Sequence, residues 1–277
     1  NPFAVAISRF RLLVAALLAS DVHKLSEAPD FRIHVAIGDS LLHGKRFGLT
    51  ATEGMFERAE HYAGTGLAHA YASEDLTEVQ RILGRQYHAV VGNPPYIVVS
   101  DSILSAAYRA QYVSCHKQYS LGAPFTERFF NIALGGSSTS PAGFVGLITT
   151  KSFMNREYGE KLVEKVLPLV DLSHVIDSSG ADIPGHNRDG TSTVILFGRH
   201  RRPVDKQVRV LKAIRPEPAT PVDRSKGLVW TAITQLIDLT GSPSPYIESV
   251  DLDRKSLAKH PWSIGGGGAA DVKRVID

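Results

Sequence analysis

The stretch Val90-Val91-Gly92-Asn93-Pro94-Pro95-Tyr96-Ile97 decides how this sequence is interpreted, because it places a rigid polar turn directly after an apolar, β-prone run. Proline fixes the backbone angle φ and lacks an N–H donor, so Pro94 and Pro95 predict a stiff turn that presents main-chain carbonyl groups outward. Asn93 adds a side-chain oxygen to them. The turn is therefore expected to offer fixed hydrogen-bond acceptors at the end of a strand, although a plain proline turn after a strand is the alternative.

Two such acceptors suit methyl transfer to an aromatic exocyclic amine. The lone pair of that nitrogen is delocalised into the ring, which makes the nitrogen a poor nucleophile. Acceptors aimed at its two N–H bonds draw the nitrogen toward tetrahedral geometry and localise the lone pair. We expect the Asn93 oxygen to be one acceptor and a main-chain carbonyl held by Pro94 and Pro95 to be the other. Tyr96 would give an aromatic face to a base rotated out of a duplex.

Similar apolar runs on both sides of this stretch indicate the fold class. They end in turn residues and alternate with helical patterns around 102–112, 125–134 and 155–170. The runs are His34–Ile37, Tyr87–Val91, Gly143–Thr149, Val175–Asp177 and Thr193–Phe197. This order predicts an α/β fold with a largely parallel sheet. Ligands gather at the carboxyl ends of such strands, so Asp39 and Asn93 are expected on one rim.

A helix precedes this series, and two later segments depart from its rhythm. The chain opens with a helical pattern from Phe3 to Leu17, for which Asn1 and Pro2 give a start signal. Residues 44–80 contain no clear strand and are interpreted as an insertion or flexible excursion. From Gln207 onward the prolines and the run Gly265–Gly268 predict a connector.

Composition limits the alternatives. The chain has 277 residues, a net charge of +3 and a single cysteine, Cys115, so an internal disulfide is impossible and a cytoplasmic location is expected. Arg9 and Arg11 interrupt the opening apolar segment, so no membrane span is expected. No metal site is expected either, because the eleven histidines form no HExxH pair. Between Arg199 and Arg224, eight basic residues face three acids, which suits either phosphate contacts or a solvated edge.

The turn resembles the Asn-Pro-Pro-Tyr motif of the amino-methyltransferases, and further segments resemble adenine-specific DNA methyltransferases in order and spacing. These segments are Gly38-Asp39-Ser40-Leu41, Phe125-Thr126-Glu127-Arg128, Gly143–Phe153 and Gly190–Gly198. The start of the chain and His260-Pro261-Trp262-Ser263 are similar to PglX-like methyltransferases of the phage growth limitation, or type 2 BREX, systems. That similarity covers essentially the whole of this chain. It covers only a middle portion of those long proteins.

The resemblance implies a Rossmann-like, S-adenosylmethionine-dependent methyltransferase fold that is N-terminally incomplete, with a mostly parallel sheet flanked by helices. It implies a catalytic core at 1–203 and, at 204–277, a connector toward a DNA-recognition region. The implied activity is methyl transfer from S-adenosyl-L-methionine to N6 of a flipped adenine in double-stranded DNA, in the setting of anti-phage defence and other defence-system proteins. The family's glycine-rich cofactor loop is expected before Asn1, so this chain alone is expected to bind the cofactor weakly or not at all.

The same resemblance assigns residues to roles, which are as follows: catalysis by Asn93, Pro94, Pro95 and Tyr96; cofactor binding by Pro2, Asp39, Ser40 and Phe125; and contact with the flipped base by Tyr96 and Ile183. Ile183 departs from the family pattern, because related enzymes often have an aromatic residue there. From the residues alone, Asp39 is also a candidate helix cap or turn aspartate. Phe125 is equally a candidate core residue.

Two other functions fit the same motif. Protein glutamine methyltransferases also use an Asn-Pro-Pro-Tyr turn, and their amide acceptor poses a similar problem of delocalisation. The chain could instead be a DNA-binding or scaffold piece of a defence complex that has no turnover of its own. The excursion at 44–80 and the late strand motif favour DNA as the substrate.

Overall fold

The computed structural model describes residues 2–47, 54–55, 74–183, 192–241 and 244–264 of the chain. These residues belong to two compact units, each described by itself. Unit 1 comprises residues 1–46 and 53–85, and unit 2 comprises residues 47–52 and 86–277.

The described residues of unit 1 form two helices and a small antiparallel pair of strands. The helices are α1 (Pro2–Ala19) and α3 (Leu76–Leu83), with a short 3-10 turn at Leu25–Glu27. The strands β1 (Lys45–Arg46) and β2 (Gly54–Met55) pair with each other. The expected opening helix is confirmed, while its proposed cap Asn1 lies outside the described residues.

The run His34–Ile37, which the sequence predicted as β, joins no sheet. A strand needs a hydrogen-bonded neighbour, and the described residues bring none to this run. The Val35 carbonyl accepts hydrogen bonds from the guanidinium group of Arg9 on α1 instead, at 3.0 Å from Nε. This prediction was therefore wrong for the described part of the chain.

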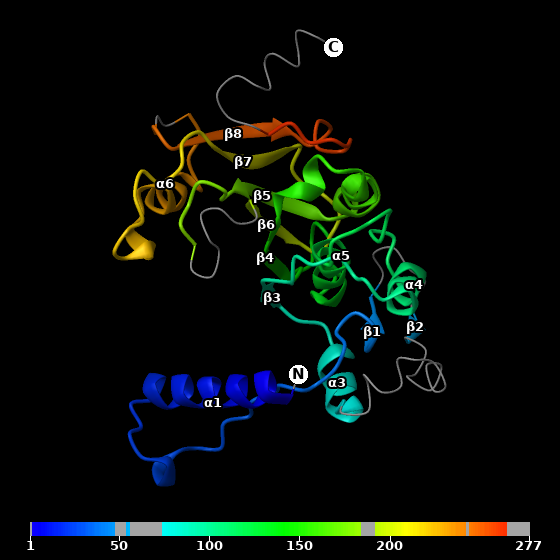
Figure 1. The fold of residues 1–277 in the computed structure, drawn as a ribbon, viewed down its shortest axis with the longest axis vertical. Coiled ribbons are helices and arrows are strands. Elements are labelled where there is room, and N and C mark those ends of the chain that lie inside the picture. Colours follow the sequence, from blue (N-terminus) through cyan, green and yellow to red (C-terminus); the bar gives the residue numbers. More distant parts are fainter. Residues whose placement is uncertain (1, 48–53, 56–73, 184–191, 242–243, 265–277) are drawn as a thin grey trace. The chain divides into compact units, whose positions relative to one another are not determined.

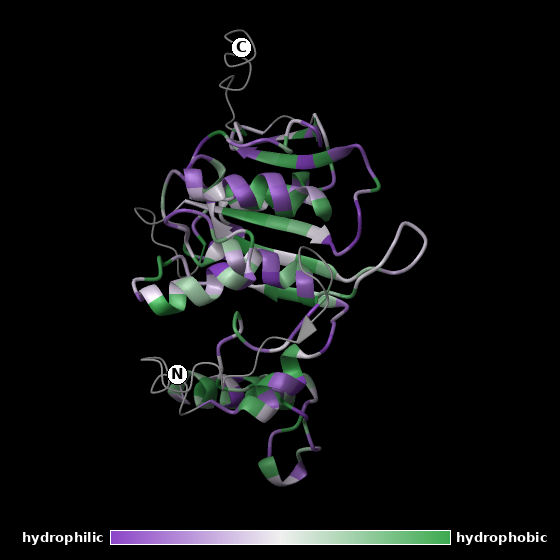
Figure 2. Ribbon diagram, turned by 90° about the vertical axis from the view of Figure 1, so that its right-hand side faces the viewer, coloured by the Kyte–Doolittle hydropathy of each residue, from purple (hydrophilic) through white to green (hydrophobic). Residues whose placement is uncertain are grey.

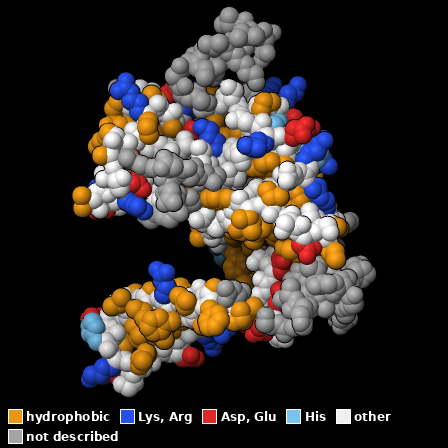
Figure 3. Space-filling view, viewed as in Figure 1, with side chains coloured by type: hydrophobic (Ala, Val, Ile, Leu, Met, Phe, Trp, Pro, Cys, Tyr) orange, Lys and Arg blue, Asp and Glu red, His pale blue; other side chains and the backbone are white. Residues whose placement is uncertain are grey.

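Helix α1 exposes its apolar side chains. None of its 18 residues is buried, and Phe3 and Phe10 are among its exposed apolar residues. Figure 3 shows hydrophobic side chains gathered along the helix. By length and apolar composition alone, Pro2–Ala19 is the one helix among the described residues that would suffice to cross a membrane.

Unit 2 is built on a six-stranded sheet in the order β3-β4-β6-β5-β7-β8 (Figure 1). The strands are β3 (Ala89–Gly92), β4 (Phe144–Thr150), β5 (Asp171–Asp177), β6 (Thr193–Arg199), β7 (Gln207–Ala213) and β8 (Ile247–Asp253). Figure 2 shows the hydrophobic residues concentrated along these strands, as expected for a sheet that forms the core.

Strand β6 gives the sheet its mixed character. It lies between β4 and β5 and is antiparallel to both. Strands β3, β4, β5 and β7 share one direction, while β6 and β8 run in the other, so three of the five neighbouring pairs are antiparallel. The expected α/β class with flanking helices is confirmed. The sequence predicted a mostly parallel sheet, and it did not predict that β6 and β8 run in the reverse direction.

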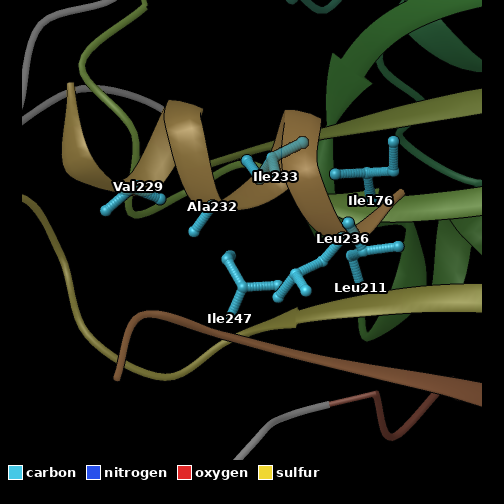
Figure 4. Packing of buried hydrophobic residues seen from close by; sticks show 7 residues of the cluster. All are labelled: Ile176, Leu211, Val229, Ala232, Ile233, Leu236 and Ile247. Atoms are coloured by element: carbon cyan, nitrogen blue, oxygen red, sulfur yellow. The ribbon is translucent and has the colours of Figure 1, made fainter. Parts of the chain in front are cut away.

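Helices flank the sheet at both ends of the strand order. Helices α4 (Ser102–Gln111) and α5 (Gly122–Ile132) follow β3, and α5 contacts β3 and β4. Short helical turns connect β4 to β5, at Lys151–Met154, Glu157–Gly159, Leu162–Val166 and Leu167–Leu169. Helix α6 (Leu228–Leu236) lies over β5, β7 and β8, where its apolar face joins the core (Figure 4).

The segment expected to be a connector, 204–277, contains part of this sheet. Strand β7 pairs with β5, and β8 pairs with β7. The carboxylate of Glu217 accepts a hydrogen bond from the Val229 amide at 2.7 Å and so caps the start of α6. The glycine run 265–268 lies outside the described residues, and a role toward DNA recognition stays a prediction.

Candidate active site

The Asn-Pro-Pro-Tyr turn begins where β3 ends. Gly92 is the last residue of the strand and lies opposite Leu147 of the parallel neighbour β4. Asn93 follows with an exposed side chain, and its Oδ1 accepts a 2.6 Å hydrogen bond from the Tyr96 hydroxyl. Burial raises the pKa of Tyr96 to about 12, so its hydroxyl stays protonated at neutral pH and acts as the donor. This bond identifies the carboxamide oxygen as the atom that faces Tyr96.

Gly92 is required because an aromatic ring packs on it. A Cβ atom added there would lie 2.7 Å from Cζ of Phe129 on α5, well inside normal contact. Phe129 meets Phe125 edge to face, with the ring centroids 6.1 Å apart. Both rings are partly exposed on a helix whose other residues are mostly buried. The predicted cofactor residue Phe125 is thus joined to the Asn93 turn through one ring.

The chain after Tyr96 is tied back to the start of α5. The Leu121 amide donates to the Ile97 carbonyl at 2.9 Å, and Val98 forms an antiparallel bridge with Ser120. A Cβ on Gly122 would lie 2.4 Å from the Thr149 hydroxyl, so the first residue of α5 lies directly against β4. These contacts fix the turn between the ends of β3 and β4.

A charged pair that the sequence did not assign to the site lies at the same edge of the sheet. Lys151 follows β4, and its Nζ lies 2.5 Å from Oδ2 of Asp177, the last residue of β5. The other oxygen of Asp177 accepts from the amide and the hydroxyl of Ser179, at 3.1 and 2.6 Å. The sequence assigned Lys151 only to a strand-and-loop motif and gave it no role in the site. Only the alignment of β4 with β5 across β6 brings the two residues together.

The predicted cofactor residues Pro2, Asp39 and Ser40 belong to unit 1. Asp39 Oδ1 accepts from the amides of Leu41 and Leu42, at 2.8 and 3.2 Å, so the alternative interpretation as a turn-capping aspartate is confirmed. Pro2 is exposed at the start of α1 and Ser40 is half-buried. A common rim for Asp39 and Asn93 stays a prediction, because the two residues lie in different units.

A buried carboxylate braces the Asp39 turn. Glu74 Oε1 accepts from the Asp39 amide, and its Oε2 lies 2.7 Å from Nε2 of His43, which is also buried. Sequence reasoning did not find this contact, because Glu74 lies 31 residues away from His43 within the excursion.

Ile183, the predicted second contact for the base, is half-buried and is the last described residue before 184–191. Its neighbour Asp182 is buried and pairs with Arg224 at 3.4 Å. The proline and glycine that follow Ile183, and the start of the segment Gly190–Gly198, lie outside the described residues. A role for Ile183 against a base stays a prediction.

Much of the basic segment 199–224 lies at the opposite edge of the sheet from Asn93. An open pocket of about 730 Å³ there is lined by five basic residues and five aspartates. Arg201 and Arg254 pair with Asp171, at 2.8 and 3.1 Å. The balance of charge favours a solvated edge over a phosphate-binding patch. No three histidine, cysteine, aspartate or glutamate residues in the described ranges are placed to hold a metal ion.

Comparison with known proteins adds the following. Residues 1–183 match the Eco57I restriction-modification methylase family. The chain is 44% identical over 289 residues to the adenine-specific methyltransferase PglX of Streptomyces coelicolor. It is 25% identical over 222 residues to the type II methyltransferase M.PaeR7I of Pseudomonas aeruginosa. Among solved structures, the type IIG restriction endonuclease BpuSI is similar over 68% of this chain and 22% of its own, with 15% identity and a TM-score of 0.46.

The chain is short beside these relatives. The first alignment covers 99% of this chain and 23% of PglX. The second covers 75% of this chain and 34% of M.PaeR7I. The chain therefore spans about a quarter of the length of one curated relative and about a third of the other.

Proposed function

Because this chain belongs to the Eco57I restriction-modification methylase family, we propose that it forms the catalytic core of a DNA adenine N6-methyltransferase. The name of the 44% identical relative, an adenine-specific methyltransferase, supports adenine as the acceptor. The proposed substrate is an adenine rotated out of double-stranded DNA. A cytoplasmic location and a place in an anti-phage defence system, with other defence proteins, are parts of the same proposal.

The observation that carries the proposal is the position of the Asn93 carboxamide. It is exposed beyond the carboxyl end of β3, with its oxygen identified by the Tyr96 bond. An amide oxygen has two lone pairs, so it can accept from a substrate N–H while Tyr96 donates to it. The stiff Pro94-Pro95 pair holds the neighbouring carbonyl groups. Such fixed acceptors stabilise developing charge without reorganisation.

The residues also fit the cofactor that the proposal requires. S-adenosyl-L-methionine would supply a methyl group already made electrophilic by its sulfonium. Phe125 has a partly exposed ring beside the Asn93 turn, which suits stacking on an adenine ring. Asp39, Ser40 and Pro2 are named as cofactor-binding residues in the same proposal. The residues of this chain then act by orienting the amine.

The chemical role assigned to Asn93 is as follows. Its oxygen and a main-chain carbonyl of the turn accept hydrogen bonds from the two N–H bonds of the adenine amine. The nitrogen becomes more tetrahedral, so its lone pair is directed at the methyl group that a bound S-adenosyl-L-methionine would present. The new N–C bond would form as the C–S bond of the sulfonium breaks, and S-adenosyl-L-homocysteine would leave as a neutral thioether. The proton that the nitrogen then loses passes to solvent. Tyr96, and Ile183 from the other side, would hold the base.

The test is replacement of Asn93 by alanine in the complete enzyme. We expect methylation of DNA to fall by at least about 100-fold, the cost typical of a lost charge-stabilising group. Cofactor affinity by calorimetry should stay within about twofold of wild type. Gln235→Ala, which removes an exposed carboxamide from α6, is the matched control and should be fully active.

Retention of most of the activity by Asn93→Ala would remove Asn93 from the mechanism. Radiolabelled methyl groups found on glutamine of a protein acceptor, and absent from DNA, would replace the proposed substrate. If addition of the complete flanking sequence to this chain gave no turnover on either substrate, the catalytic proposal as a whole would fail.

A further inference from the structure

We propose that Lys151, held in place by Asp177, is a positioning residue that binds a phosphate group of the DNA strand carrying the target adenine. The inference rests on the proposed function, because it names a further contact for the same substrate. It comes from the arrangement of strand ends in unit 2.

Strand register places Lys151 on the side of the Asn93 turn where β4 ends. Gly92 lies opposite Leu147, so Asn93 comes level with Ile148 on the adjacent strand. Lys151 follows three positions later, roughly 10 Å farther along at about 3.3 Å per residue. Both residues therefore lie beyond the carboxyl ends of neighbouring parallel strands, the edge at which ligands bind in such sheets.

Lys151 is held by one main-chain contact and one side-chain contact. Its main-chain amide donates to the Ser192 carbonyl at 2.8 Å, next to the start of β6. Its Nζ lies 2.5 Å from Oδ2 of Asp177, whose side chain is only 2% exposed. Asp177 is itself held by Ser179. An exposed ion pair is mobile and weak, whereas this carboxylate is buried and anchored.

The pair leaves hydrogen-bonding capacity for a ligand. A lysine ammonium has three N–H donors, and Asp177 Oδ2 accepts one of them. No second acceptor for Nζ is found among the residues that the structure describes. The Lys151 side chain is 25% exposed, so the remaining donors can reach solvent or a ligand.

A phosphate oxygen matches this group better than a base does. It carries a negative charge, so its bond to the ammonium gains a Coulomb attraction that a neutral acceptor does not give. Phosphate contacts fix the register of a protein on DNA, which is what an enzyme needs if Asn93 is to meet the amine of a rotated base. The ring nitrogens of adenine are neutral acceptors and are therefore the less favoured partner.

The experiment measures DNA affinity as a function of salt in the complete enzyme. The probe is a duplex that the wild-type enzyme methylates, titrated between low and moderate KCl. Lys151→Gln removes the charge and keeps an N–H donor at the end of a slightly shorter side chain. We expect the slope of log K against log salt to become smaller by about 0.9, the value for one phosphate contact. The double variant K151Q/D177N should show the same change, which excludes an effect of an unpaired carboxylate.

Lys165→Gln is the matched control, because Lys165 is an exposed lysine in the same connection between β4 and β5. Its salt slope should equal that of wild type. Duplexes with one neutral methylphosphonate at successive positions then identify the contact. One position should weaken wild-type binding and leave Lys151→Gln unaffected. Cofactor affinity should not change in any variant.

An unchanged slope in both Lys151 variants would overturn the inference. So would sensitivity of wild type, but not of Lys151→Gln, to 7-deazaadenine in place of the target adenine, because the lysine would then bind the base ring. If Asn93→Ala abolishes methylation while the Lys151 variants behave as wild type, the inference fails alone. If Asn93→Ala is fully active, Asn93 leaves the mechanism; if the complete enzyme methylates neither DNA nor protein, the proposed function fails whatever the slopes are.

Discussion

Gly92→Ala tests whether the position of Asn93 is set by the packing of α5 on the end of β3. The added Cβ would lie 2.7 and 2.8 Å from two atoms of the Phe129 ring. Ordinary carbon contacts lie at about 3.5–4.0 Å, so the ring or the strand end must move by about 1 Å. Overpacking of this kind typically costs about 1–3 kcal/mol of unfolding free energy.

The same displacement should reach the chemistry, because Asn93 is the next residue in the chain. A misplacement of about 1 Å can cost about 100-fold in rate. Phe129→Leu should relieve the clash by removing ring atoms. In the double variant we therefore expect a favourable coupling of about 1–2 kcal/mol and recovery of part of the lost activity.

The assay is a double-mutant cycle. Unfolding free energies come from urea titrations of the four proteins, and kcat comes from DNA methylation. Gly135→Ala is the control, since its added Cβ would lie 3.7 Å from the nearest atom and should leave both quantities near wild type. Additivity of Gly92→Ala and Phe129→Leu within about 0.5 kcal/mol would refute the reasoning, because uncoupled sites add within that error.

Three further predictions concern stability. Burial lowers the pKa of His200, and the hydrogen bond to the Ala133 carbonyl opposes this to a smaller extent. The pKa of His174 is also lowered, mainly by burial and secondly by the nearby charge of Arg209. Both side chains therefore take up a proton at lower pH in the folded state than in the unfolded state, so stability should be complete above about pH 6.5 and fall below it as the unfolded state takes up protons; urea midpoints that stay flat from pH 7.5 to 5 would contradict this. Glu217→Ala should lower the unfolding free energy by about 1–2 kcal/mol through loss of the α6 cap, while Glu217→Gln retains most of it in the same titration. Asp171→Ala, which leaves two arginines without their buried carboxylate, should cost about 3 kcal/mol, and a loss under 1 kcal/mol would show that the pairing is dispensable.

The sequence predicted the parts of the fold that local pattern determines. The opening helix, the strands that end at Gly92 and Thr150, and the turn at Asn93 each carry their own signal of periodicity or turn chemistry. Strand direction carries no such signal. The stretch 178–192 lacks a helical pattern, which is typical of a reversal between antiparallel strands without a helical crossover.

Contacts between distant segments were harder to predict. From the sequence, Gly92 was interpreted only as part of a motif. In the structure, a glycine is needed there because the ring of Phe129, on helix α5, packs against it. Glu217 caps α6 from 12 residues away, in a stretch that looked like a connector. Lys151 and Asp177 meet because β6 aligns the strands that carry them. Pairing across a sheet decides such contacts, and no single stretch of sequence encodes it.

The central place of β6 sets the order in which the sheet can be completed during synthesis. Strands β4 and β5 do not pair with each other, and each pairs with β6. The part of the sheet with β4 therefore cannot join the part with β5 until the ribosome has released residue 199. Until then, the edge of β4 that pairs with β6 has no hydrogen-bonded neighbour. The family match ends at residue 183, ten residues before β6 begins. An expression clone trimmed to that boundary would omit the strand that joins the two pieces.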